Sequence, residues 1–343
     1  MKLRAPVQVA CVGVGYFSQY HYQSWARIDD VWLIAACDSE VDRAKATGLP
    51  AFADLSQMLA RQKPDLLDVI LPPASQADAI RIALEAGVKW IICQKPFCRS
   101  LAEAEALSAE ADAKGATIVI HENFRFQPWY RAIKRVLDSG DCGEIHQARF
   151  HLRPGDGQGE AAYLDRQPYF RQMPRFLVHE TAIHWVDTFR YLFGTPVSVY
   201  ADLRQINPAI SGEDAGFILF DHANGVRSLF DGNRHLDHVS DDLRRTIGTA
   251  VIEGSEGTLE LRGDGSVSLR RFGDTAERII LAPDEGSGFG GDCVHALQSH
   301  VISALLNGTV LENTAPDYLE VIRIEEAIYL SAALGCKQGL NGR

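Results

Sequence analysis

The chain lacks any block of lysine or arginine residues, and it lacks a long apolar run. Its 343 residues include 45 Asp and Glu against 34 Lys and Arg, which gives a formal net charge of −11. An acidic chain without a basic patch is a poor match for nucleic acid or an anionic membrane, so we expect neither as a partner. No stretch approaches the length of a membrane span, and the short apolar run near the start breaks into a glycine loop, which favours a first strand over a signal peptide. These absences predict a cytoplasmic protein.

The chain also lacks the cysteine patterns that mark disulfides and metal sites. Its seven cysteines are an odd number without a CxxC pair, and Cys11, Cys37 and Cys93 fall in predicted buried strands. Such cysteines are typical of reduced core thiols. The HExxH metal motif is absent as well, because His179-Glu180 is followed by His184, one residue too far along. We therefore expect no metal, and a chain about two domains long needs no such staple to fold.

A glycine-rich turn follows the first predicted strand. Val7 to Val12 is a short apolar run, and the sequence GVGYFS from Gly13 to Ser18 then opens a helix. In this G-x-G-x-x-S pattern the first glycine permits a tight turn, the second lets a pyrophosphate approach the backbone, and the small Ser18 allows close packing of helix on strand. The helix amino terminus offers N–H groups to phosphate oxygens. The cofactor-binding residues expected in this turn are Gly13, Gly15, Tyr16 and Phe17.

The second predicted strand, Val31 to Cys37, ends at Asp38, twenty residues after Ser18. A carboxylate at this place accepts hydrogen bonds from the adenosine ribose hydroxyls and repels a 2′-phosphate. The alternative role of Asp38 is an N-cap for the segment from Glu40 to Ala46. Because the loop, the strand and the spacing occur together, we favour the ribose role and NAD over NADP.

Strands and helices alternate through the first third of the chain, which predicts a doubly wound parallel sheet. The apolar run that starts at Val88 stops at Gln94-Lys95-Pro96. A proline cannot donate to a sheet and biases the residue before it toward extended geometry, so we place Lys95 at the carboxyl end of a strand. Open α/β sheets bind their ligands at this edge, which also carries Asp38 and Pro72. The alternative is a lysine that leaves the sheet for solvent.

The periodicity changes from His121 onward. Phe176 to Phe193 predicts a helix, and strands of period two with the hairpin turn Asn224-Gly225 follow. The predicted fold is therefore an α/β domain over 1–122, followed over 123–343 by an α+β domain with a large, mostly antiparallel sheet. One face of such a sheet packs on helices and the other can pair with another subunit, so we expect a homodimer or homotetramer through this sheet.

The predicted helix carries Glu180 and His184 four residues apart. If helical, the two residues share a face, and a carboxylate one turn before an imidazole can orient it or raise its basicity. The alternative is a surface Glu–His pair that contributes roughly 0.3 kcal/mol. Spacing alone favours this second interpretation.

The chain resembles the Gfo/Idh/MocA family, the glucose–fructose oxidoreductase and inositol dehydrogenase group, over essentially its whole length. The residues that carry the resemblance are the Gly13–Ser18 loop, Pro72-Pro73, Gln94-Lys95-Pro96, Asn123 through Phe126, and Glu180 through His184. Within the family, the sequences CQKPF and HENFR and the surroundings of His184 are similar to D-apiose dehydrogenase-like members.

The resemblance implies a Rossmann domain that binds NAD and a second domain for substrate binding and oligomerisation. In the family, the lysine of a Glu-Lys-Pro motif touches the nicotinamide ribose and the substrate, and the histidine of an Asp-x-x-x-His motif is the general base. By position, Lys95 and His184 are then the catalytic pair, with Glu180 in place of the aspartate. The further cofactor-binding residues expected are Asp38, Pro72, Gln76, Gln94 and Lys95. The expected substrate contacts are Lys95, Glu180 and His184. Further candidates, for each of which a structural role is the favoured alternative, are Asn123, Arg125, Arg153, Tyr163 and His179.

Three positions depart from the family pattern. Gln94 replaces the family glutamate and removes a negative charge beside the lysine and the cofactor ribose. Gln76 stands where many members have histidine, and Glu180 is one methylene longer than aspartate. These departures bear on cofactor contacts and substrate choice more than on the reaction type.

The expected activity is NAD-dependent oxidation of a secondary or anomeric hydroxyl of a sugar, cyclitol or related polyol. Such a reaction needs a base for the hydroxyl proton and a carbon held against the nicotinamide for hydride loss. His184 supplies a side chain suited to the first task, and Lys95 can stabilise the developing alkoxide. Two other function classes stay open: a glycosidase that uses tightly held NAD in an oxidation–elimination–reduction cycle, and a non-catalytic sugar-sensing regulator on the same fold.

Overall fold

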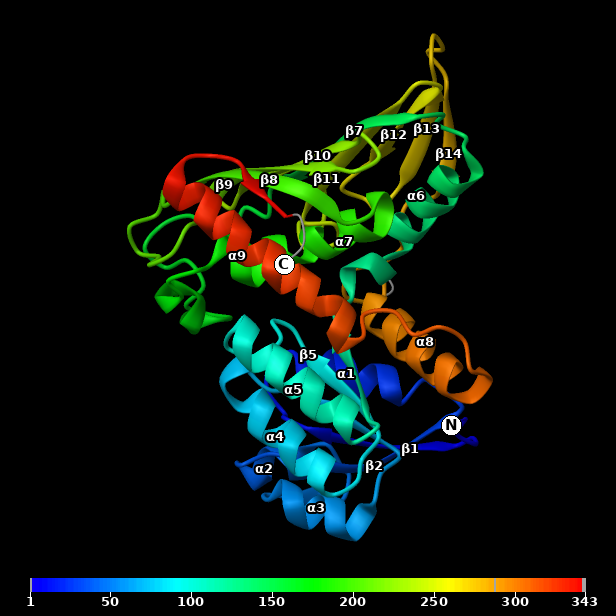
Figure 1. Cartoon of the computed structure of the whole chain (residues 1–343), viewed down its shortest axis with the longest axis vertical. Helices are drawn as coiled ribbons and strands as arrows, with labels where there is room; N and C mark the ends of the chain where they lie inside the picture. The colour runs from blue at the N-terminus through cyan, green and yellow to red at the C-terminus, as the bar shows by residue number, and fades with distance from the viewer. Residues whose placement is uncertain (1, 287, 341–343) are drawn as a thin grey trace. The chain divides into compact units, whose positions relative to one another are not determined.

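A computed structural model describes residues 2–286 and 288–340 of the chain. The chain forms two compact units (Figure 1). The first unit combines Met1–Asn123 with Val294–Ile322, and the second combines Phe124–Cys293 with Arg323–Arg343. The division of cofactor and substrate binding between 1–122 and 123–343 stays a prediction.

The first unit is built on a parallel sheet. In the part of the chain that the structure describes, this sheet has six strands in the order β3-β2-β1-β4-β5-β6, and all neighbours run parallel. The predicted doubly wound parallel sheet is thus confirmed. Its strands are β1 (Val7–Val12), β2 (Val31–Cys37), β3 (Ala51–Phe52), β4 (Leu66–Val69), β5 (Trp90–Gln94) and β6 (Thr117–His121).

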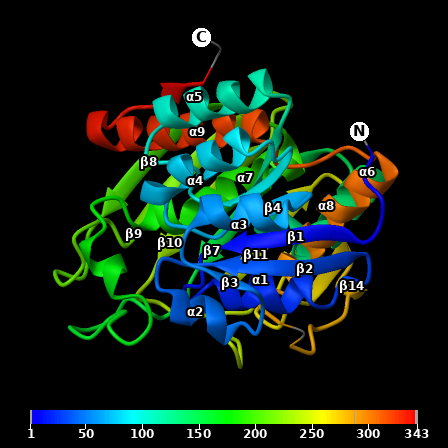
Figure 2. The same ribbon diagram turned by 90° about the horizontal axis from the view of Figure 1, so that it is seen from below.

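Helices cover both faces of this sheet. In Figure 2, α3, α4 and α5 lie on one side of the strands and α1 lies on the other. Right-handed crossovers between parallel strands produce this arrangement, since the strand order reverses at β1 and β4. The helices are α1 (Ser18–Trp25), α2 (Val41–Ala46), α3 (Leu55–Gln62), α4 (Pro73–Glu85), α5 (Leu101–Ala113) and α8 (Cys293–Asn307), and α9 (Ala315–Leu334) begins in the first unit and ends in the second.

Lys95 directly follows β5, as the proline after it predicts. The strand is shorter than expected at its other end and begins at Trp90 instead of Val88. Gly87, at φ +85°, closes α4, and the Val88 N–H then donates to the Ala83 carbonyl at 3.0 Å. Val88 therefore completes the helix terminus and is not free to join the sheet.

The second unit contains a mixed sheet. Among residues 2–286 and 288–340 it has nine strands in the order β14-β13-β12-β11-β7-β10-β9-β8-β15, of which β7 and β10 run parallel and the other neighbours antiparallel. The predicted large, mostly antiparallel sheet is confirmed. Its strands are β7 (Ile145–Leu152), β8 (Pro196–Arg204), β9 (Ala215–His222), β10 (Arg227–Asn233), β11 (Gly248–Gly254), β12 (Gly257–Leu261), β13 (Val267–Arg271), β14 (Glu277–Leu281) and β15 (Gln338–Gly339).

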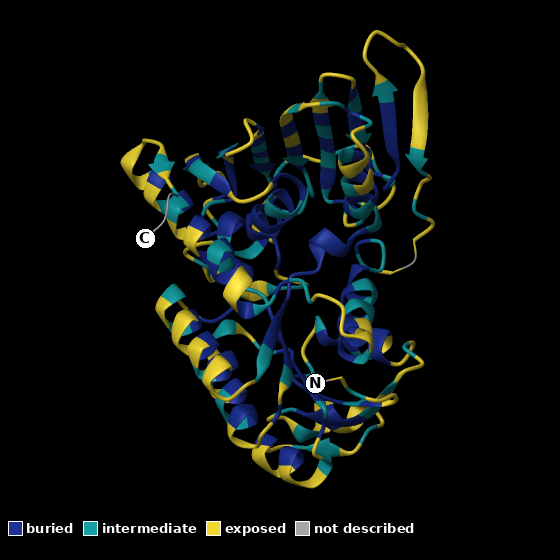
Figure 3. Cartoon of the chain, turned by 45° about the vertical axis from the view of Figure 1, so that its right-hand side comes forward, coloured by how far each residue is buried: buried dark blue, intermediate teal, exposed yellow. Residues whose placement is uncertain are grey.

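Helices α6 (Pro128–Ser139) and α7 (Ile183–Phe193) lie along one face of this sheet (Figure 1). Burial alternates along its strands, which appear banded in Figure 3, because successive side chains point to opposite faces. Trp185 anchors α7 on the sheet: its ring centroid lies 4.1 Å from that of Phe150 and 5.4 Å from that of Phe230. Its indole N–H donates to the Tyr130 hydroxyl at 2.9 Å, so the buried donor of this large side chain is matched.

The predicted helix from Phe176 to Phe193 is wrong in one respect. Only its second part is α-helical, and Leu177–Ala182 forms a π-helical turn, η3, before α7. The Glu213 side chain accepts hydrogen bonds from the N–H groups of Phe176 and Val178, each at 3.1 Å. A carboxylate from a distant loop thus shapes the start of this segment, and sequence periodicity carries no signal for it. Two short 3-10 turns, η1 (Phe124–Phe126) and η2 (Pro168–Gln172), complete the unit.

The composition raises two questions, the state of the cysteines and the apolar character of the helices. Within the described residues the seven cysteines are free thiols, and all but Cys336 are buried. None of the described helices combines the length and apolar character that a membrane crossing requires.

The turn after β1 leads to a stability prediction. Gly13 has φ +102°, and a Cβ built on it would lie 2.2 Å from the Ile70 carbonyl oxygen, whereas a Cβ on Gly15 meets nothing within 4 Å. We expect Gly13→Ala to lower the free energy of unfolding by about 2–4 kcal/mol through backbone strain and overlap. The matched Gly15→Ala variant should change it by less than about 1 kcal/mol. Urea denaturation measures both, and equal losses in the two variants would contradict the stated cause.

Candidate functional site

The glycine turn of the first unit leaves its backbone accessible. The Gly13 N–H donates to the Cys37 carbonyl at 2.8 Å, which ties the turn to the end of β2. Ser18 is buried, and its hydroxyl donates to the Gly15 carbonyl at 2.6 Å, so the small third residue closes the turn onto α1. The space beside Gly15 lets a pyrophosphate come close to the main chain, and the turn therefore fits a dinucleotide.

Asp38 is held at the end of β2 by two backbone donors. Its Oδ2 accepts from the Val14 N–H at 2.8 Å, and its Oδ1 accepts from the Glu40 N–H at 2.9 Å. A carboxylate has about four acceptor sites, so both oxygens can still receive ribose hydroxyls. The N-cap position of α2 is Glu40, whose side chain makes no capping bond, and Asp38 is therefore not the N-cap that was the alternative.

Gln76 fixes the turn that carries Lys95. This fully buried side chain donates to the carbonyls of Leu71, at 3.0 Å, and Gln94, at 2.9 Å, while its oxygen accepts from the Cys98 N–H at 2.7 Å. Its amide thus joins the end of β4 to both sides of Lys95. These contacts give Gln76 a structural role, and its expected contact with the cofactor stays a prediction. Pro72, at the same edge, is the N-cap of α4.

Gln94 is bound to a buried histidine that the sequence did not single out. The Gln94 amide nitrogen lies 2.5 Å from His21 Nε2, and His21 Nδ1 lies 2.8 Å from Asp68 Oδ2. Trp25 donates its indole N–H to the same Asp68 oxygen at 2.8 Å. The available signal was Asp68 itself, a charged residue inside an otherwise apolar strand.

Asn123, the last residue of the first unit's amino-terminal part, is 3% exposed. Its amide nitrogen is buried and has no hydrogen-bond partner among the residues the structure describes. An unsatisfied buried donor of this kind is costly unless a ligand or water completes it. This observation is compatible with the expected hydroxyl contact, which stays a prediction.

His184 lies at the first turn of α7 in the second unit. Its ring stacks flat on Phe124, with centroids 3.7 Å apart and planes 3° from parallel, and the residue is only 6% exposed. Its carbonyl accepts from the Thr188 hydroxyl at 2.8 Å within the helix. The imidazole orientation is therefore set by an aromatic neighbour from η1, and His184 is not the exposed partner of a surface pair.

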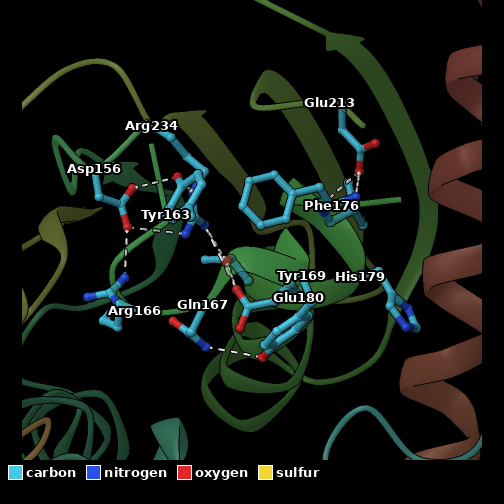
Figure 4. Close-up of polar contacts among 12 residues, drawn as sticks. Asp156, Tyr163, Arg166, Gln167, Tyr169, Phe176, His179, Glu180, Glu213 and Arg234 are labelled. Carbon is cyan, nitrogen blue, oxygen red and sulfur yellow. Dashed lines mark hydrogen bonds and ion pairs between the residues drawn. The ribbon is translucent and has the colours of Figure 1, made fainter. Parts of the chain in front are cut away.

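Glu180 belongs to a polar cluster around Arg234 (Figure 4). The Thr181 hydroxyl donates to Glu180 Oε2, and Arg234 Nη1 lies 2.6 Å from that hydroxyl and 3.9 Å from Oε2. Glu180 lies in the π turn and His184 at the start of the α-helix. A guanidinium that directly follows β10 lies beside the Glu180 carboxylate, and the expected role of Glu180 toward His184 stays a prediction.

Arg234 is the centre of this cluster and is 4% exposed. It donates to the Tyr163 hydroxyl at 2.6 Å and to Asp156 at 3.3 Å, and Tyr163 donates to Asp156 at 2.9 Å (Figure 4). Burial lowers the pKa of Arg234, but the negative charges of Asp156 and Glu180 and the hydrogen bond to Tyr163 outweigh it and raise the pKa above its ordinary value. Burial raises the pKa of Tyr163, so the phenol stays protonated. The sequence predicted Tyr163 but missed Asp156 and Arg234, which no short motif marks.

His179 faces α9 and is oriented by it. The Nδ1 atom of His179 lies 2.6 Å from Oε1 of Glu325, a residue 3% exposed. The backbone N–H of His179 donates to the Tyr329 hydroxyl at 3.2 Å. Tyr329 donates in turn to Glu213 at 2.7 Å, the same carboxylate that shapes the start of η3. The π turn is thus held from two sides, and the expected substrate contact of His179 stays a prediction.

Both arginines expected at the substrate are already paired with carboxylates. Arg125 forms a buried bidentate pair with Asp187, at 2.7 and 2.5 Å. Arg153 pairs with Asp231 at 2.8 Å and also donates to the carbonyl of Asp231 at 2.8 Å. Geometry gives both arginines structural roles, since each guanidinium is fixed by its own unit, and substrate binding by either stays a prediction.

The described residues contain no group of three or more His, Cys, Asp or Glu side chains arranged to hold a metal ion. In the second unit, His179 pairs with Glu325 while Glu180 turns toward Arg234, so these neighbours in sequence contact different partners.

A parallel sheet whose first strand leads into a glycine turn, with a carboxylate after its second strand, defines a dinucleotide-binding protein. The family model of NAD-binding Rossmann oxidoreductases, GFO_IDH_MocA, matches residues 7–122, and the GFO/IDH/MocA C-terminal domain matches residues 130–260. The chain belongs to the Gfo/Idh/MocA family of NAD-dependent oxidoreductases. The family resemblance and the expectation of an oxidoreductase are thereby confirmed.

Named relatives match nearly the whole chain. It is 32% identical to a D-apiose dehydrogenase of Paraburkholderia graminis over 338 residues, covering 95% of this chain and 88% of the relative. A second D-apiose dehydrogenase, of Rhizobium rhizogenes, is 28% identical and covers 95% of each chain. An oxidoreductase of Agrobacterium radiobacter, solved in complex with NAD+, L-tartaric acid and magnesium, is 27% identical with a TM-score of 0.88 and covers 97% of this chain and 98% of its own.

Proposed function

We propose that this protein is an NAD-dependent dehydrogenase that oxidises a secondary or anomeric hydroxyl of a sugar, cyclitol or related polyol by hydride transfer. The observation that carries the proposal is the Gly13 turn with Asp38 at the adjoining strand end, held by Val14 and able to accept ribose hydroxyls. The similarity to two D-apiose dehydrogenases supports a sugar or polyol as the substrate class.

In this proposal Lys95 and His184 are the catalytic pair. When bound, NAD supplies the hydride acceptor. His184 takes the proton of the substrate hydroxyl, and the flat stacking on Phe124 keeps its ring in one plane for that transfer. Lys95 donates to the same oxygen and stabilises the alkoxide that develops. Glu180, oriented by Thr181 and Arg234, accepts a second substrate hydroxyl.

A turnover screen tests the reaction class. Purified protein should reduce NAD in the presence of at least one member of a panel of aldoses, inositols and apiose, measured by NADH absorbance. Cofactor binding without reduction of NAD or NADP by any of them would contradict the proposal. Release of sugar from a nitrophenyl glycoside without net NADH would identify the glycosidase alternative, and a ligand-induced rise in Tm without turnover would identify the sensor.

Loss of either residue of the catalytic pair should lower turnover. Lys95→Ala and His184→Ala should each lower kcat about a hundredfold or more, because each removes electrostatic or acid–base stabilisation of the transition state. Lys45→Ala, in an exposed surface pair with Asp42, and His222→Gln, at a buried histidine at the end of β9, are matched controls that should retain kcat within about twofold. Full activity in either catalytic variant would remove that residue from the proposed pair.

The Asp38 carboxylate should make the protein prefer NAD to NADP. Its carboxylate would repel the 2′-phosphate of NADP, so Asp38→Ser should raise the ratio of kcat/KM for NADP to that for NAD about tenfold or more. Asp42→Ser removes an exposed carboxylate four residues away and should leave the ratio unchanged. Steady-state kinetics with both cofactors measures the ratio, and a wild-type preference for NADP would overturn the assignment.

The open face of the second sheet is the proposed subunit interface. Tyr200 on β8 and Phe217 on β9 are 39% and 48% exposed, and the neighbouring Leu219 and Leu229 on the same face are half-buried. Contiguous apolar residues on a sheet face favour burial against a second copy. Light scattering should give the mass of two or four chains, and Phe217→Glu should lower it toward one chain. A monomeric wild type would exclude the interface.

The cytoplasm is the proposed location. Free thiols at all seven cysteines suit a reducing compartment, where disulfides are rare.

A further inference from the structure

A buried hydrogen-bond chain runs from Asp68 on β4 through His21 on α1 to Gln94 at the end of β5. Asp68 and His21 are fully buried, and Gln94 is 8% exposed. The two links are short, 2.8 Å from Asp68 Oδ2 to His21 Nδ1 and 2.5 Å from His21 Nε2 to the Gln94 amide nitrogen. None of the three takes part in the proposed proton transfer. A buried polar chain is costly to keep, and Asp68 Oδ1 has no hydrogen-bond partner among the described residues.

One arrangement of donors and acceptors satisfies both short links of this chain. A carboxylate only accepts, so His21 donates its Nδ1 proton to Asp68, whose Oδ2 also receives the indole N–H of Trp25. His21 Nε2 then carries a lone pair and accepts an N–H from the Gln94 amide. A glutamate at position 94 would bring no hydrogen to this contact. The glutamine at position 94 supplies that hydrogen.

The main chain at Gln94 is fixed as well as its side chain. The Gln94 carbonyl accepts from the buried amide of Gln76 at 2.9 Å, and the oxygen of the same amide accepts from the Cys98 N–H at 2.7 Å. Lys95 is the next residue after Gln94, so its backbone starts from a strand end whose side chain and carbonyl are both held. Gln298 on α8 adds a long contact, 3.4 Å from its amide nitrogen to Asp68 Oδ2.

We infer that His21 and Asp68 are positioning residues that act through Gln94 to fix Lys95 for catalysis. The inference rests on the proposed function, because it presumes that Lys95 contacts the reacting oxygen. It also explains the departure from the family's Glu-Lys-Pro pattern: in this chain the residue before the lysine is anchored by a neutral amide–imidazole contact, and the carboxylate lies one imidazole further away. Displacement of a catalytic group by about 1 Å can cost up to a hundredfold in rate, so such anchoring has a measurable effect.

A double-mutant cycle tests the inference. His21→Leu removes the imidazole, and Gln94→Met removes only the amide while keeping the length of the side chain and the His21–Asp68 contact. Each is made alone and together with Lys95→Ala, and kcat is measured under single-turnover conditions with circular dichroism as the check on folding. We expect each to lower kcat about tenfold or more in the wild type and less than about twofold in the Lys95→Ala background. His222→Gln serves as the control, with the same small factor in both backgrounds.

Different results would overturn the positioning role of His21 and Asp68 and the catalytic role of Lys95. Equal losses in both backgrounds would show a general structural effect and overturn the inference, as would full activity of Gln94→Met in the wild type. If Lys95→Ala alone keeps full turnover, the proposed role of Lys95 fails instead. Where His21→Leu does not fold, Gln94→Met decides, because it leaves the buried Asp68–His21 pair intact.

Discussion

The first unit depends on one close approach, between the turn after β1 and the carbonyl of Ile70 after β4. A Cβ at Gly13 would lie 2.2 Å from that oxygen, so the two strand ends can meet only where the residue has no side chain. β1 and β4 are the neighbours at which the strand order reverses. The Gly13 turn, Asp38 and Lys95 consequently follow the carboxyl ends of strands in one sheet, and this edge is where α/β sheets bind ligands.

In the second unit, buried arginine side chains are paired with carboxylates. Arg125, Arg153 and Arg234 are each matched by a carboxylate from another segment, namely Asp187, Asp231 and Asp156. Removal of one partner would leave a charge inside the protein, so these pairs fix the positions of the segments that carry them. Three of the candidate substrate contacts, Arg125, Arg153 and Tyr163, lie in such clusters, and their contacts give each a structural task, while substrate binding by them stays a prediction.

Local pattern predicted much of the candidate cofactor site because its residues follow strands. Asp38 follows a strand of seven residues, Lys95 precedes a proline, and the glycine turn has its own spacing, so each is visible within a short window. The π turn before His184 was not predictable in this way. It forms because Glu213, more than thirty residues later, accepts the N–H groups of Phe176 and Val178. A side chain that arrives from a distant loop changes the hydrogen-bond ladder without a trace in the local periodicity.

The sequence by itself determined the parallel sheet, the glycine turn and the strand-end placement of Asp38 and Lys95, because backbone preferences and hydrophobic period act over a few residues. Only the tertiary structure decided which polar groups meet. His21 contacts Asp68 and Gln94, which lie 47 and 73 residues away in the sequence. Arg234 contacts Asp156, which lies 78 residues away. Such pairings follow from the strand order and from the need to satisfy buried polar groups, neither of which a short window of sequence contains.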